Sequence, residues 1–120
     1  MTSFSGRSEW TFGLPALLDL FDGDRDALGG LLEAAIGSIA RDVGQIEAAI
    51  TAGEQAGLAG VAHRLKGTSG TIDARRVFAA ATALEGAARD GPGALAALAA
   101  ELRLAFGEVE SDVAAYFAAN

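Results

Sequence analysis

Residues 24–53 decide the fold, and their sequence is DRDALGGLLEAAIGSIARDVGQIEAAITAG. The larger apolar residues of this stretch recur at steps of three and four: Leu28, Leu32, Ile36, Ile39, Val43, Ile46 and Ile50. Because an α-helix completes a turn every ~3.6 residues, this spacing places them in one stripe on one helix face. Asp24 can cap the first turn, and Gly53 can end the last one. The stretch therefore predicts a helix from about Asp24 to Ala52.

Four more helices are predicted, one before this helix and three after it. They are a short helix over Pro15–Phe21, a second long helix from Glu54 to about Ser69, a third from a cap at Asp73 to a turn at 90–93, and a fourth from Ala94 to about Ala118. The residues expected to face inward are Val77, Phe78, Ala81, Leu84 and Ala88 on the third, and Leu95, Leu98, Leu102, Phe106, Val109, Val113 and Phe117 on the fourth.

These patterns predict an all-α fold, namely an antiparallel up-down four-helix bundle with a short additional N-terminal helix. The bundle domain is expected to span residues 13–120. Residues 1–12 are expected to form an N-terminal extension, a candidate for flexibility. Tyr116 is predicted at the rim of the last helix. The solvated face of this last helix is predicted to carry four acidic residues, Glu101, Glu108, Glu110 and Asp112.

The composition of the 120-residue chain excludes several classes of protein. Sixteen acidic against nine basic residues give a net charge of -7, which argues against binding to nucleic acid or to an anionic membrane. The chain has no cysteine and one histidine, so disulfides, thiol catalysis and any site with two imidazoles are excluded. No apolar run is long enough to span a bilayer. We therefore expect a soluble, monomeric, cytoplasmic domain.

The single histidine, His63, is predicted on the second long helix and on the side away from the core. That side also carries residues with little or no side chain: Ala56, Ala59, Gly60, Gly67 and Gly70, with Lys66 at its edge. Each glycine inside a helix costs about 1 kcal/mol relative to alanine, so stability alone would favour other residues there. A face this bare lets another surface approach the imidazole closely. A solvated surface histidine with no role is, from the residues alone, an equally good interpretation.

The run from Ala62 to Gly70, AHRLKGTSG, resembles the His-x-Leu-Lys-Gly signature of histidine-containing phosphotransfer (HPt) domains. The resemblance extends over about Leu17 to Phe117. Two further stretches carry it: Phe21-Asp22-Gly23-Asp24, which resembles the entry into the family's first long helix, and Leu84-Glu85, which resembles its next helix. The chain departs from the family where Asp73-Ala74 replaces the usual Gly-Ala.

The resemblance implies that His63 accepts a phosphoryl group, through Nε2, from an aspartyl phosphate on a receiver domain and passes it to another receiver. Lys66 would offset charge on the phosphoryl oxygens, and Gly67 would leave room for the phosphate. Gly60, Arg64, Gly67 and Gly70 are assigned to the partner-docking surface. The implied partners are response regulator receiver domains and a hybrid histidine kinase.

No cofactor of its own is expected for this chain, because it has neither a nucleotide-binding glycine loop nor an acidic cluster close to His63 in sequence. Mg²⁺ is expected to come from the receiver partner. The domain is therefore interpreted as a phosphocarrier without kinase activity of its own. Between His63 and Arg76 there are four bases against one acid, which predicts a local basic patch; salt bridges at the helix end are the alternative for Arg75 and Arg76.

Other functions remain open at this point. The chain could be the phospho-acceptor domain of a chemotaxis-type histidine kinase, which takes its phosphate from an ATP-bound kinase domain. It could also be a non-catalytic helical module that binds a partner helix, with His63 incidental. A metal site has the least support, because no ligand set has a recognisable spacing. Met1 favours a free-standing protein over a domain excised from a hybrid kinase.

Overall fold

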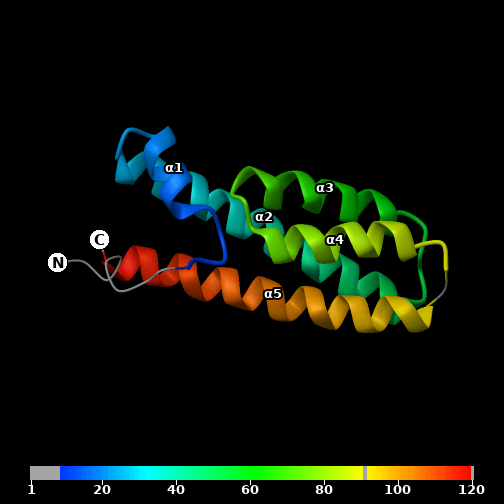
Figure 1. Ribbon diagram of the computed structural model, residues 1–120. Coiled ribbons are helices and arrows are strands. Elements are labelled where there is room, and N and C mark those ends of the chain that lie inside the picture. Colours follow the sequence, from blue (N-terminus) through cyan, green and yellow to red (C-terminus); the bar gives the residue numbers. More distant parts are fainter. Residues whose placement is uncertain (1–8, 91, 120) are drawn as a thin grey trace.

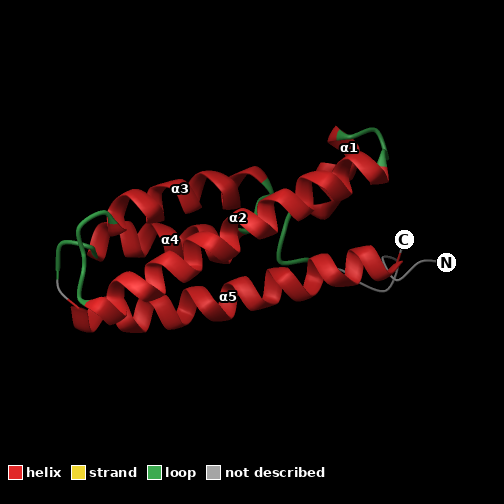
Figure 2. Ribbon diagram, turned by 180° about the vertical axis from the view of Figure 1, so that it is seen from behind, coloured by secondary structure: helices red, strands yellow, loops and turns green. Residues whose placement is uncertain are grey.

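The computed structural model of the protein describes residues 9–90 and 92–119. It contains α1 (Leu14–Leu20), α2 (Arg25–Ala52), α3 (Leu58–Thr71), α4 (Arg75–Ala87) and α5 (Pro92–Ala119), as Figure 1 shows. Every regular element of this part of the chain is a helix, and the segments between them are loops and turns (Figure 2). The all-α prediction is confirmed.

The four long helices lie lengthwise beside one another (Figure 1). α3 packs against α2 and α4, α5 packs against α4 and α2, and α1 packs against α2. α2 and α5 have 28 residues each, whereas α3 has 14 and α4 has 13. The short pair therefore covers only part of the length of the long pair. α1 and the segment that precedes it cover the remaining end of the bundle.

The apolar stripe of α2 lies where the sequence predicts. Leu28, Leu32, Ile39, Val43 and Ile46 are completely buried, and Ile36 and Ile50 pack against the core with part of their surface exposed. Both predicted ends of this helix are confirmed. The Asp24 carboxylate accepts a hydrogen bond of 3.0 Å from the Ala27 N–H. Gly53 ends the helix with a φ of 70°, a conformation that glycine adopts without strain.

The second and third predicted long helices begin later than expected. The second starts at Leu58, not Glu54, because Gly57 has a φ of 86° and keeps residues 54–57 in a loop. The third starts at Arg75, and Asp73 does not cap it. Asp73 has a φ of 52° and lies in the turn, where its N–H donates to the Gly70 carbonyl at 3.1 Å.

Four assignments of buried and exposed residues were wrong. Phe78 and Phe117 are each 41% exposed. Tyr116 is buried and donates its hydroxyl to the Arg25 carbonyl at 3.2 Å. Buried residues of α5 recur every seven positions, and Tyr116 belongs to this series with Leu95, Leu102 and Val109. Asp112 is also buried and does not belong to the solvated face of that helix.

Asp112 is buried because it holds the segment that leads into α1. Its Oδ2 accepts two hydrogen bonds from Thr11, at 2.7 Å from the backbone N–H and 2.8 Å from the hydroxyl. The next residue, Phe12, lies in the core, and the Gly13 N–H donates to the Ile72 carbonyl at 2.9 Å. Contact with the bundle thus begins before residue 13. Residues 1–8 lie outside the described residues, and the predicted extension stays a prediction.

We predict that Asp24→Ala lowers the free energy of unfolding by about 1 kcal/mol, because the Ala27 N–H loses its acceptor. Urea denaturation followed by circular dichroism measures the difference. Glu33→Ala removes an exposed carboxylate from the same helix and serves as the control, with an expected change within ~0.5 kcal/mol. Equal losses in both variants would show that the cap contributes nothing.

Candidate functional site

His63 lies in the middle of α3, and its imidazole is 72% exposed. Leu58, Ala62, Leu65 and Ser69 face the core from the same helix, so His63 is turned outward. At Gly60 and Gly67, a Cβ atom would meet no other atom within 4 Å. The prediction of an exposed histidine in mid-helix is therefore confirmed, and the helix surface on both sides of it is open.

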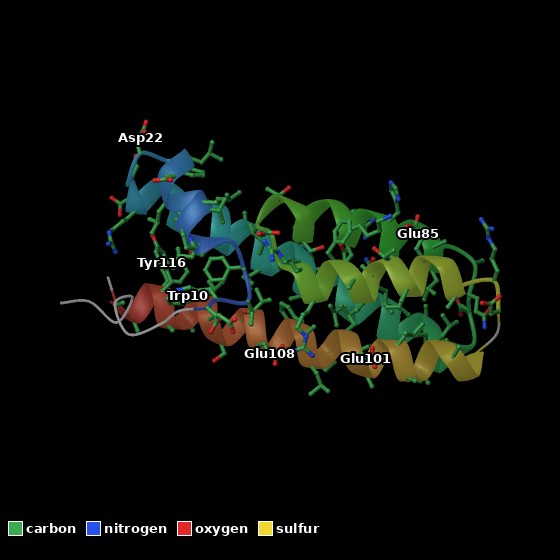
Figure 3. The ribbon with its side chains drawn as sticks, in the orientation of Figure 1. Trp10, Asp22, Glu85, Glu101, Glu108 and Tyr116 are labelled. Carbon is green, nitrogen blue, oxygen red and sulfur yellow. The ribbon has the colours of Figure 1, made fainter. Side chains whose placement is uncertain are left out.

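Glu85 of α4 links His63 to Lys66. Its Oε2 lies 2.9 Å from Nδ1 of His63, and its Oε1 accepts a hydrogen bond of 3.0 Å from Nζ of Lys66. Figure 3 shows Glu85 where α3 and α4 run side by side. Nζ of Lys66 also lies 5.9 Å from the centre of the Phe78 ring, and only 26% of the lysine side chain is exposed. The lysine therefore has a fixed position beside the histidine.

The charge of Glu85 determines which nitrogen of His63 carries the proton. The hydrogen bond from Lys66 lowers the pKa of Glu85, against an opposing effect of desolvation and with a further contribution from His63. An ionised carboxylate can only accept hydrogen bonds, so a neutral imidazole must place its proton on Nδ1. The lone pair of the ring is then on Nε2, on the opposite side from Glu85. The contact with Glu85 therefore leaves the exposed nitrogen as the nucleophilic one.

Arg64 is turned to the other side of α3, toward α2. Its Nε and Nη2 donate to Oδ1 of Asp42 at 3.1 and 2.7 Å, and Nη2 also donates to Gln45 at 2.9 Å. The other predicted bases are paired as well: Arg75 lies 3.4 Å from Asp73, and Arg76 pairs with Glu108. Each of the four cations, Lys66 included, thus has a carboxylate partner, and the predicted basic patch is largely neutralised.

The structure brings His63, Lys66, Gly60 and Gly67 together on one surface. Gly70 is one turn further along, where a Cβ would lie 3.7 Å from the Phe78 ring. Sequence reasoning missed the functional contact of Glu85. A signal for it exists, because residues at equal distances from the turn of a helical hairpin lie opposite each other. His63 and Glu85 are each eleven residues from Ala74, in the turn between α3 and α4.

Three other features of the described residues bear on function. No group of three His, Asp or Glu side chains in residues 9–90 and 92–119 could hold a metal ion. No helix in the same part of the chain is long and apolar enough to cross a membrane. A hollow of about 1190 Å³ lies between α5 and residues 9–16, and His63 is not among its lining residues.

Comparison with known proteins identifies the family. The family model of the Hpt domain matches residues 30–116, which include His63, Lys66 and Glu85. No curated protein and no solved structure matches the chain. The chain belongs to the Hpt domain family. Hpt domains carry out histidine phosphotransfer in two-component phosphorelays, where they interact with receiver domains and kinases.

We predict that Glu85→Gln changes the tautomer of His63. When the His63 ring is neutral, the parent protein is expected to carry the ring proton on Nδ1, because the Glu85 carboxylate accepts a hydrogen bond from it. The amide of the variant can also donate, so a larger fraction of rings is expected to carry the proton on Nε2. Nitrogen chemical shifts of the imidazole measure this in an untagged protein, whose single histidine gives an unambiguous signal.

Glu101→Gln is the matched control, because Glu101 is exposed on α5, away from Glu85 (Figure 3). It should leave the tautomer of His63 unchanged. Identical ring spectra for the parent protein and Glu85→Gln would refute the role of Glu85.

Proposed function

We propose that this chain is a histidine phosphocarrier of a two-component phosphorelay. It accepts a phosphoryl group on Nε2 of His63 from the aspartyl phosphate of one receiver domain and passes it to another receiver domain. The observation that carries this proposal is the exposed imidazole with its Nδ1 held by Glu85, on a helix surface that Gly60 and Gly67 leave open. The chain reversals between α2, α3, α4 and α5 also support an antiparallel up-down order of the four helices.

The transfer needs no proton to leave Nε2. The Nε2 lone pair attacks phosphorus, the bond between phosphorus and the aspartyl oxygen breaks, and the receiver recovers its free carboxylate. The proton on Nδ1 stays on the ring and faces Glu85, whose negative charge stabilises the positive charge that develops on the imidazole. Transfer to the second receiver is the same step in reverse.

Lys66 offsets the charge of the phosphoryl oxygens in this proposal. Its ammonium group also binds Glu85 at 3.0 Å, so its charge is divided between the carboxylate and the incoming phosphoryl group. Mg²⁺ comes from the receiver, because the acidic residues that hold it belong to that partner. The chain contributes the nucleophile, the orientation of the ring and a docking surface of Gly60, Arg64, Gly67 and Gly70, which is open at Gly60 and Gly67.

The direct test is phosphoryl transfer from a phosphorylated receiver to the parent protein and to His63→Gln. The variant keeps a polar side chain of similar size on an exposed position, so its thermal unfolding should match that of the parent. We expect transfer to the parent and none to the variant, because the nucleophile is gone. Transfer to His63→Gln would mean that another residue is the acceptor. Labelling by an ATP-bound kinase domain alone would favour the chemotaxis-type acceptor instead.

Gly67 tests the need for an open surface. Gly67→Ala should raise the free energy of unfolding by about 1 kcal/mol, because alanine favours the helix and its Cβ meets no other atom within 4 Å. Gly67→Gln should leave the fold intact but cover the imidazole and slow transfer from the receiver. Transfer time courses and thermal melts on both variants measure these effects. A Gly67→Gln protein that transfers as fast as the parent would contradict the steric argument.

A further inference from the structure

Asp42 is a buried carboxylate on α2, with 3% of its side chain exposed. Its Oδ1 accepts both hydrogen bonds from Arg64, and its buried Oδ2 has no hydrogen-bond partner among the described residues. An unsatisfied buried polar atom destabilises the folded state. Apolar residues in place of a buried ion pair are often neutral or stabilising. Stability alone therefore does not account for an aspartate at this position.

The effect of Asp42 is to fix the direction of Arg64. Nε and Nη2 of the guanidinium donate to Asp42, and Nη2 also donates to Gln45. Nη1 makes no hydrogen bond within the described part of the chain. The arginine side chain is still 56% exposed. Because the guanidinium is already held, its remaining amino group can bind a partner with a smaller loss of side-chain entropy.

Arg64 also lies at the edge of a groove beside the acceptor histidine. The groove, of about 520 Å³, runs between α2 and α3 and is lined by small or apolar residues that include Leu31, Ala34, Ser38, Gly67 and Thr68. Gly67 is one helical turn from His63 and belongs to both the groove and the open surface. A partner that covers His63 and Gly67 would therefore reach the groove that Arg64 lines.

We propose that Asp42 is a positioning residue for partner docking: it holds Arg64 so that the free Nη1 group binds an acidic side chain on the receiver domain seated over His63. This inference rests on the proposed phosphocarrier function and adds a specificity-determining contact to it. Asp42 and Arg64 take no part in the chemical step at Nε2. They act on the encounter with the protein partner.

The test compares a protein donor with a small one. In Asp42→Asn, the apparent KM for the phosphorylated receiver should rise by roughly threefold to fivefold, as for the loss of one partly exposed ion pair. Labelling of His63 by phosphoramidate should keep the parent rate, because this donor needs no docking surface. The difference in KM should shrink as salt is added, since the lost contact is ionic. A purely structural role for Asp42 would not raise the KM for the receiver while leaving the rate of labelling by phosphoramidate unchanged.

Two further variants secure the interpretation. Arg64→Lys keeps the charge but loses the planar group that Asp42 orients, and it should raise the KM to a similar extent. Glu47→Gln is the matched control, because Glu47 also lies on α2 and pairs with an arginine, Arg103 of α5. It should leave the KM for the receiver unchanged.

Several results would overturn the proposal. One is an unchanged or lowered KM for the receiver in Asp42→Asn. Another is an equal effect of Asp42→Asn on the KM when Arg64 is already replaced by Gln. If Asp42→Asn does not fold, an unchanged KM in Arg64→Lys would overturn the proposal. Failure of the parent protein to take phosphate from either donor would instead refute the phosphocarrier function. The two hypotheses therefore fail in different ways.

Discussion

At Asp73 the backbone takes a left-handed conformation, with a φ of 52°, and this ends α3 and turns the chain into α4. The Ala74 N–H donates to the Ser69 carbonyl at 2.8 Å and so closes the last turn of α3. The length and direction of this turn fix the register of α4 against α3. That register places Glu85 opposite both His63 and Lys66, so the geometry around the imidazole follows from a single turn.

α3 combines two requirements that oppose each other. One side must bury Leu58, Ala62, Leu65 and Ser69 against the neighbouring helices. The other side carries glycines where a helix would be more stable with alanine. The buried side therefore stabilises a helix whose exposed side is poorly suited to form one. Ion pairs also join this helix to α2 and α4, through Arg64 with Asp42 and Lys66 with Glu85.

The sequence was sufficient where the signal is local. The stripe and caps of α2 and the outward direction of His63 depend on spacing within one helix, and all are confirmed. The start of α3 was not predicted, because Glu54 and Gln55 suit a helix and only the backbone of Gly57 excludes one. The contacts of Glu85 and Asp42 join residues 22 positions apart on different helices, and single-helix patterns carry no information about them.

The hydrogen bonds between Thr11 and Asp112 close a much longer loop than the contacts of Glu85 and Asp42, because they join residues 101 positions apart. The entropy lost on closing a flexible loop grows with the logarithm of its length, so this closure costs about 1 kcal/mol more than one of 22 residues. Local contacts also form faster than distant ones. We therefore expect the hairpins around His63 to form before the contact between Thr11 and Asp112.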